Sequence, residues 1–129
     1  MVVPDEVADH VAALVGCRVS TAYRGVVERG RLNGGEVLCV HGCGGVGLAA
    51  IALGRALGAR VVAVDVNDEA LVLAKAMGAD DLVDAPRVSE VGAFVHELTG
   101  GAHVSVDCLG HVSTLSASIF GLRPLGRHV

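Results

Sequence analysis

The sequence predicts an α/β fold in which helices cover both faces of a doubly wound parallel sheet. From Glu36 onward, short apolar runs alternate with segments of helical periodicity, a pattern that implies right-handed crossovers and parallel strands. The runs at 37–40 and 61–64 are continuously apolar, as expected of strands buried on both faces. Glycines follow the predicted helices, where a residue of positive φ closes the last turn, at Gly58, Gly78, Gly100 and Gly121.

Two helices are predicted before the sheet. Apolar residues recur at the spacing of one helical face after Pro4-Asp5, at Val7, Val11, Leu14 and Val15. A second helix is predicted from about Ser20 to Arg29, with Gly30 in the stop position. We therefore expect residues 1–35 to form helices that lead into the fold and residues 36–129 to form the sheet domain, all in one compact unit.

The sheet region is predicted to contain strands at 37–40, 61–64, 81–84 and 103–107, with the opening of a fifth at 127–129. Helices are predicted at 46–57 and 68–77, and two later helices carry apolar faces at Val91, Phe94, Val95 and Leu98 and at Val112, Leu115 and Ile119. Doubly wound sheets usually have six strands, so this one is expected to be C-terminally incomplete. The exposed sheet edge is expected to favour a homo-oligomer.

Composition narrows the function classes. The chain has 129 residues, 52% of them hydrophobic and 19% charged, which is far from the composition of a disordered protein. It carries 10 Lys plus Arg against 14 Asp plus Glu, for a net charge of −4. Because no basic cluster with interleaved aromatic residues is present, nucleic acid is not expected as a partner.

Location is predicted from the cysteines and from the first residues. The segment Met1 to Glu6 has neither the basic nor the apolar region of a secretory signal. Cys17, Cys39, Cys43 and Cys108 lie in apolar or glycine-rich stretches, so a reducing cytoplasm is expected. Residues 37–54 lack charge, but their five glycines favour a strand, a tight turn and a buried helix over a membrane span, so no membrane partner is expected.

A glycine-rich motif follows the first predicted strand. In His41-Gly42-Cys43-Gly44-Gly45-Val46-Gly47, three glycines satisfy G-x-G-x-x-G. Gly42 is expected to permit the tight turn, Gly44 to let a diphosphate approach the backbone, and Gly47 to let the helix pack close to the strand. The N–H groups and positive dipole end of the following helix would face the phosphates. The motif predicts a Rossmann-type dinucleotide-binding domain.

Asp65 ends the next predicted strand, 18 residues beyond Gly47. There a carboxylate would accept hydrogen bonds from the ribose hydroxyls and repel a 2′-phosphate, which favours NAD over NADP. Asn67 is the better candidate to cap the following helix, which would leave Asp65 free for the ribose. Two alternatives remain: the glycines and Asp65 serve only a tight turn and a cap, or the site takes S-adenosylmethionine.

Four strings resemble the zinc-dependent alcohol dehydrogenases of the medium-chain dehydrogenase/reductase family. They are Gly16-Cys17-Arg18-Val19-Ser20-Thr21-Ala22-Tyr23, the glycine motif at 41–47, AVDVND at 63–68 and KAMGADDLVD at 75–84. The resemblance implies an oxidoreductase in which an alcohol is oxidised by hydride transfer to NAD, with zinc acting on the alcohol oxygen.

The resemblance also implies roles for individual residues. Cys17 matches a zinc ligand and Thr21 matches a catalytic-site residue close to the nicotinamide ring. The coenzyme-binding residues are expected to be Gly42, Cys43, Gly44, Gly45, Val46, Gly47, Asp65 and Val66. Cys39 and the side chain of Cys43 are expected to be structural thiols.

The departures from the family bear on activity. Catalytic zinc needs three protein ligands, and only Cys17 matches one, so the chain alone is expected to lack dehydrogenase turnover. The pocket for the substrate alcohol is expected to be shaped by a catalytic domain outside these residues. Two other functions remain open: a zinc-free quinone reductase of the same family, and a stand-alone nucleotide-binding or redox-sensing module.

Overall fold

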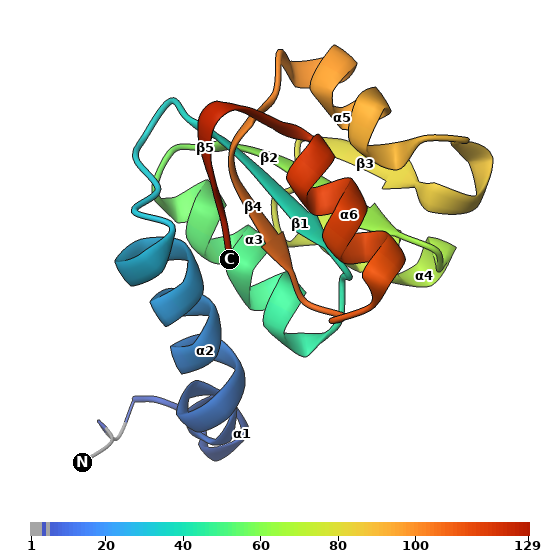
Figure 1. The fold of residues 1–129 in the computed structure, drawn as a ribbon. Helices are drawn as coiled ribbons and strands as arrows, with labels where there is room; N and C mark the ends of the chain where they lie inside the picture. Colours follow the sequence, from blue (N-terminus) through green and yellow to red (C-terminus); the bar gives the residue numbers. More distant parts are fainter. Residues whose placement is uncertain (1–3, 5) are drawn as a thin grey trace.

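A computed structural model describes residues 4 and 6–129 and contains a five-stranded, fully parallel sheet. Its strand order is β3-β2-β1-β4-β5 (Figure 1). The strands are β1 (Val37–His41), β2 (Arg60–Asp65), β3 (Asp81–Asp84), β4 (Ala102–Asp107) and β5 (Leu122–His128). The order reverses between β1 and β4, which is where doubly wound sheets bind ligands. The predicted α/β, Rossmann-type fold is confirmed.

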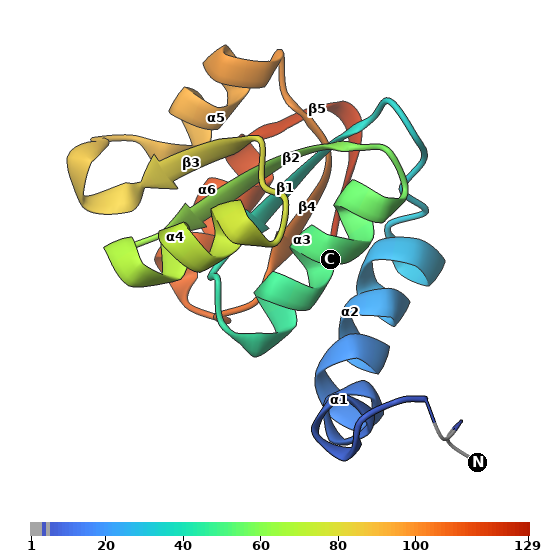
Figure 2. The same cartoon turned by 180° about the vertical axis from the view of Figure 1, so that it is seen from behind.

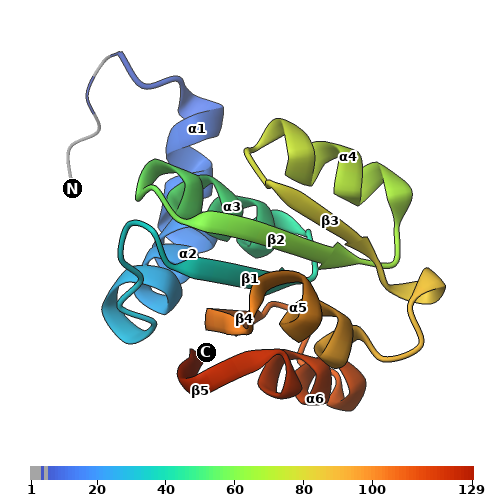
Figure 3. The same cartoon turned by 90° about the horizontal axis from the view of Figure 1, so that it is seen from above.

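Helices cover both faces of this sheet. The later helices are α3 (Gly45–Ala56), α4 (Asp68–Ala76), α5 (Val91–Thr99) and α6 (Val112–Phe120), with a short 3₁₀ turn η3 (Ala85–Arg87) after β3. Figures 2 and 3 show α3 and α4 on one face and α5 and α6 on the other. Among the described residues, none of the helices combines the length and the apolar character needed to cross a bilayer.

The N-terminal segment is one uninterrupted helical run, so the prediction of two separate helices was wrong. It passes through α1 (Asp9–Leu14), a π-helical segment η1 (Val15–Val19), α2 (Ser20–Tyr23) and a second π-helical segment η2 (Arg24–Arg29). Gly16 keeps a helical conformation within it and no break follows. The run packs on α3 through α2 and η1.

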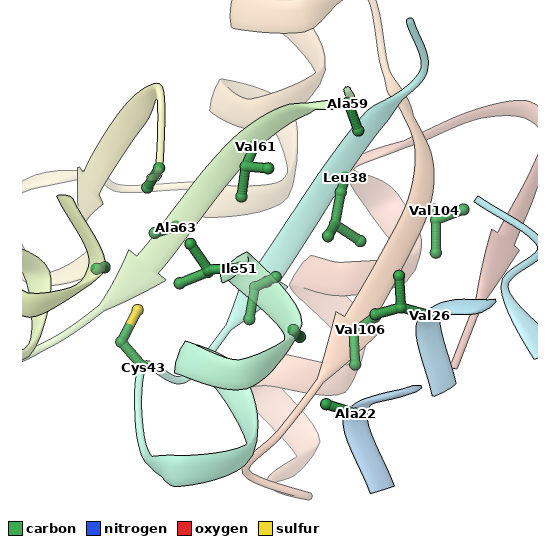
Figure 4. Close-up of a cluster of buried hydrophobic side chains, with 14 of the residues drawn as sticks. Ala22, Val26, Leu38, Cys43, Ile51, Ala59, Val61, Ala63, Val104 and Val106 are labelled. Atoms are coloured by element: carbon green, nitrogen blue, oxygen red, sulfur yellow. The ribbon is translucent and has the colours of Figure 1, made fainter. Parts of the chain in front are cut away.

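Two apolar cores flank the sheet. Figure 4 shows the larger one, in which Leu38 of β1 and Ile51 of α3 lie with Ala22 and Val26 of the N-terminal run. The smaller core lies under α5 and includes Cys39 and Val95. All five residues of β1 are buried, so the prediction from its continuous apolar run is confirmed.

Two predicted apolar helix faces are largely exposed, and a third is only half buried. Val11, Leu14 and Val15 of the N-terminal run are 37–44% exposed, and Val112, Leu115 and Ile119 of α6 are 77%, 41% and 48% exposed. On α5, Val95 is buried and Val91 packs against the smaller core, but Phe94 and Leu98 are 40% and 37% exposed. Helix α6 buries Ser118, whose hydroxyl lies 2.7 Å from that of Ser105 in β4. The hydrogen bond satisfies both hydroxyls, so a polar residue can occupy the buried position.

The C-terminal strand differs from its prediction. β5 begins at Leu122, five residues before the predicted opening at Arg127, and its pairing with β4 is irregular between Ala102 and Val104. Gly121, expected to have positive φ, has φ −77°, whereas Gly58, Gly78 and Gly100 have φ values of 79°, 109° and 75°.

Arg127 ties β5 to the segment that precedes β1. Its Nε donates to the carbonyl oxygen of Gly30 at 2.6 Å, and its Nη2 donates to Glu36 Oε2 at 2.6 Å. Burial raises the pKa of the Glu36 carboxyl, but hydrogen bonds from Arg127 and from the N–H of Asn33 more than offset this and hold the pKa below its ordinary value of 4.5.

We expect Arg127→Met to lower the free energy of unfolding by about 2 kcal/mol at pH 7, because it removes charge-assisted hydrogen bonds. Glu36 is charged in the native state above pH 4.5, so its contribution is fully present there and is lost as the pH falls through its lowered pKa. The difference between wild type and variant should therefore shrink below pH 4.5, as measured by urea unfolding at several pH values. An unchanged difference at pH 3 would contradict this origin.

Candidate functional site

The glycine loop lies between β1 and α3, at the carboxyl edge of the sheet. Gly42 has φ +90°, and its N–H donates to the carbonyl oxygen of Val64 at 2.8 Å. Gly44 is the N-cap of α3 and offers no side chain to the free N–H groups of the first turn. A Cβ built on Gly44 would meet no atom within 4 Å. The loop therefore exposes unpaired N–H donors beside open space, as an anion site requires.

Gly47 lies in the first turn of α3, at the other end of the loop. A Cβ built on it would overlap the carbonyl oxygen of Gly42. Helix α3 can thus approach β1 only because this residue has no side chain. The geometry confirms the predicted tight turn at Gly42 and the predicted close packing at Gly47, while Gly44 has open space beside it.

Asp65, at the end of β2, is bound to the backbone of two loops. Its Oδ2 accepts from the N–H of Cys43 at 2.6 Å, and its Oδ1 accepts from the N–H groups of Val66 at 2.7 Å and Asn67 at 2.9 Å. The expectation of a free carboxylate was wrong, because the carboxylate anchors the glycine loop to the β2–α4 turn. A carboxylate can accept about four hydrogen bonds, so acceptor capacity for a ribose hydroxyl remains.

Two neighbours of Asp65, Val66 and Asn67, lie in the turn between β2 and α4. Asn67 caps α4 by accepting from the N–H of Glu69 at 2.8 Å, which confirms that prediction. Val66 is 71% exposed at the same edge of the sheet.

Two of the thiols near the sheet are buried and a third is half-buried. Burial raises the pKa of Cys39 and of Cys43 to about 12 and that of Cys108, the half-buried one, to about 11. Cys39 and Cys43 are 0% and 3% exposed, so both fit the predicted structural role and remain protonated.

The histidine before the loop is also structural. His41 is 1% exposed, with Nε2 3.4 Å from the sulfur of Cys39. Burial lowers its pKa to about 4, so it is neutral near pH 7.

A cavity of about 350 Å³ lies between the start of α3 and the end of β4. Thr21 of α2 and Val46 of α3 both line it. It is completed by residues that sequence reasoning did not assign, and these include Cys108, Leu109 and Val129. Their signal was their place directly after a strand, at the same carboxyl edge as the loop.

Leu109 lies over the glycine loop. A Cβ on Gly42 would come within 2.7 Å of its Cγ. Asp107 holds this turn, since its Oδ1 accepts from the N–H groups of Leu109 at 3.0 Å and Gly110 at 3.2 Å. Asp107 thus caps the turn.

Cys17 is an exposed thiol in η1, one helical turn before Thr21. Within residues 4 and 6–129, there is no group of three His, Cys, Asp or Glu side chains that could hold a metal ion. The described residues therefore fit a single thiolate ligand and do not make up a zinc site.

Another depression of the surface lies elsewhere. It measures about 1010 Å³ between α5 and α6, and its lining includes His96, Ser113 and Phe120. These helices cover the face opposite α3 (Figures 1 and 2). The depression is thus separate from the glycine loop.

Comparisons with known protein families and sequences identify relatives of this chain. A protein-family model described as "Zinc-binding dehydrogenase" matches residues 45–129. The chain is 36% identical over 108 residues to a probable S-(hydroxymethyl)glutathione dehydrogenase 1 of Schizosaccharomyces pombe, covering 82% of this chain and 29% of that protein. It is 38% identical over 104 residues to an alcohol dehydrogenase of Geobacillus stearothermophilus, covering 81% and 30%. The chain thus spans about three tenths of the length of these relatives.

Solved structures agree in fold. The alcohol dehydrogenase TADH from Thermus sp. ATN1 superposes with a TM-score of 0.89 at 33% identity, covering 97% of this chain and 37% of that one. A mycobacterial quinone oxidoreductase superposes with a TM-score of 0.87 at 34% identity, covering 96% and 39%. A mycobacterial protein complexed with NADPH also has a TM-score of 0.87, at 32% identity, covering 96% and 38%.

The family model covers well over half of the chain, including all of α3 and everything after it. The fold and the loop geometry agree with that match. This chain belongs to the zinc-binding dehydrogenase family, among oxidoreductases of the medium-chain type.

Proposed function

We propose that the chain is the NAD(H)-binding domain of a zinc-dependent alcohol dehydrogenase, in which an alcohol is oxidised to an aldehyde or ketone. The observation that carries the proposal is the open space at Gly44, which lies beside uncapped N–H groups of α3. The Asp65 carboxylate anchors the loop next to this space. These features suit a diphosphate next to a ribose.

The chain's own residues would divide the work along the sheet edge. The N–H groups at the start of α3 would bind the diphosphate, and Asp65 would accept a hydrogen bond from an adenosine ribose hydroxyl. The cavity beside Thr21, Val46 and Cys108 would hold the nicotinamide and limit its contact with water. The bound coenzyme supplies the hydride acceptor, while the protein supplies position and electrostatics.

Zinc enters the proposal only through Cys17. Its exposed thiol would contribute one ligand, and the other ligands and the alcohol pocket would have to come from outside the described residues. We accordingly expect the chain alone to bind coenzyme weakly and to show no dehydrogenase turnover. The proposal also places the protein in the cytoplasm as a homo-oligomer, with a small alcohol as substrate in the intact enzyme.

A zinc-free quinone reductase of the same family is the second candidate. Its support is the similarity to a mycobacterial quinone oxidoreductase and to a protein complexed with NADPH. Asp65 favours NAD(H), since a carboxylate at this place repels a 2′-phosphate. Preference for NADPH over NADH would therefore favour the second candidate.

The test is a calorimetric titration of the 129-residue chain with NADH, NADPH and S-adenosylmethionine, repeated on Gly44→Ala. We expect NADH to bind most tightly and S-adenosylmethionine not to bind. The alanine methyl group would occupy the space at the diphosphate, so NADH affinity should fall at least about tenfold. Thermal stability should change little, because φ at Gly44 is −77° and an N-cap Gly-to-Ala change costs about 1 kcal/mol or less.

Equal NADH affinity in the wild type and in Gly44→Ala would show that the loop is not the diphosphate site. A folded chain that binds S-adenosylmethionine and neither nucleotide would replace the proposal with a methyl-transfer function. Tight NADH binding, without need of any partner, would favour a stand-alone nucleotide-binding module.

A further inference from the structure

We propose that Arg18 is a further coenzyme-binding residue, whose guanidinium group pairs with the diphosphate at the start of α3. This inference rests on the proposed function and adds to it a residue from the N-terminal helical run. The run lies beside α3 (Figure 2), and its segment η1 contacts that helix.

The position of Arg18 follows from its contact with Gly45, the first residue of α3. A Cβ built on Gly45 would lie 2.5 Å from Cδ, 2.6 Å from Nε and 3.0 Å from Cζ of Arg18. The end of the arginine side chain therefore lies directly against the backbone of Gly45. Gly44, with open space at its Cα, is the adjacent residue. The guanidinium group thus borders the place where a diphosphate would approach.

The electrostatics around this contact favour an anion, although Arg18 is also exposed to solvent. The first turn of α3 contains no acidic residue, and its N-cap offers no side-chain acceptor. The positive end of the helix dipole is thus next to a permanently charged guanidinium group. Across residues 4 and 6–129, no ion pair includes Arg18. A diphosphate between Arg18 and the N–H groups of α3 would satisfy both positive groups at once.

A purely structural role of Arg18 would depend on its side-chain packing and not on its positive charge. Arg18 lines an apolar depression of about 380 Å³ together with Leu14, Leu48 and Met77. An uncharged side chain of similar length would cover these residues equally well. Replacement by methionine therefore separates the two roles.

The experiment compares Arg18→Met, Arg18→Lys and the matched control Arg24→Met. Replacing Arg24 by methionine makes the same change in net charge on the same helical run. The Arg24 side chain is 68% exposed and pairs with Glu28 at 3.8 Å. Each protein is titrated with NADH, ADP-ribose and adenosine, and its thermal midpoint is measured without ligand. ADP-ribose contains the diphosphate and adenosine does not.

We expect Arg18→Met to weaken NADH and ADP-ribose about tenfold and to leave adenosine unchanged, because one charge-assisted contact is lost. Arg18→Lys should recover part of that loss, and Arg24→Met should bind like the wild type. The thermal midpoints should agree, since the methionine stem still covers the apolar depression.

Unchanged binding of NADH by Arg18→Met would overturn the inference while leaving the proposed function intact. So would an equal weakening of all three ligands together with a lower thermal midpoint, which would show a structural role. If the wild type bound neither NADH nor ADP-ribose, the proposed function would fail, and this inference would fail with it.

Discussion

Gly47→Ala is expected to lower the free energy of unfolding by about 3 kcal/mol and to remove NADH binding. The alanine Cβ would overlap the carbonyl oxygen of Gly42, so α3 and the glycine loop could not both keep their positions. Because Gly47 is buried and the obstructing atom belongs to the backbone, no change of rotamer relieves the overlap. Urea unfolding followed by circular dichroism measures the first effect, and calorimetry measures the second.

Gly44→Ala is the matched control, because it adds the same methyl group three residues earlier, where no atom lies within 4 Å. The pair should separate stability from binding: both variants lose NADH affinity, but only Gly47→Ala loses several kcal/mol of stability. A Gly47→Ala protein as stable as Gly44→Ala would mean that the close approach of α3 to β1 is not needed.

Asp65→Ala is expected to abolish the preference for NADH over NADPH, which we expect to be about 100-fold in the wild type from repulsion of a 2′-phosphate. NADH itself should bind more weakly, because a ribose acceptor and the anchor of the glycine loop are lost together. Three backbone N–H groups would lose their acceptor, those of Cys43, Val66 and Asn67. Because the N–H of Cys43 is the least accessible to water, we also expect a stability loss of about 2 kcal/mol.

Asp65→Asn separates these contributions. It keeps the shape and one acceptor oxygen but removes the negative charge, so it should recover stability relative to alanine and still bind NADPH almost as well as NADH. Coenzyme affinities by calorimetry and unfolding by urea provide the two measurements. An asparagine variant that kept the full preference for NADH would show that charge at Asp65 does not set coenzyme choice.

The sequence predicted what depends on local pattern and on one motif. Continuous apolar runs identify the buried strands β1 and β2, and the glycine spacing identifies a loop in which Gly42 and Gly47 are required for different steric reasons. The Asn67 cap was equally predictable, since its acceptor role involves only the N–H two residues later. Such features follow from the local sequence alone.

The contacts that were missed join distant parts of the chain. Asp65 and Cys43 are 22 residues apart, and their hydrogen bond depends on how the loop closes over the end of β2. The contact of Arg18 with Gly45 likewise depends on the angle at which the N-terminal run crosses α3. Periodicity predicted an apolar stripe on α6, but not what would cover it, and among the described residues the stripe stays exposed.

The uninterrupted N-terminal helical run has a mechanical consequence. Cys17, Arg18 and Thr21 lie within about 6 Å along one helix axis, so none of them can be repositioned alone. Any displacement of the backbone at one of them would therefore displace the others, so the thiol, the guanidinium group and the hydroxyl keep the order and spacing that the helix sets.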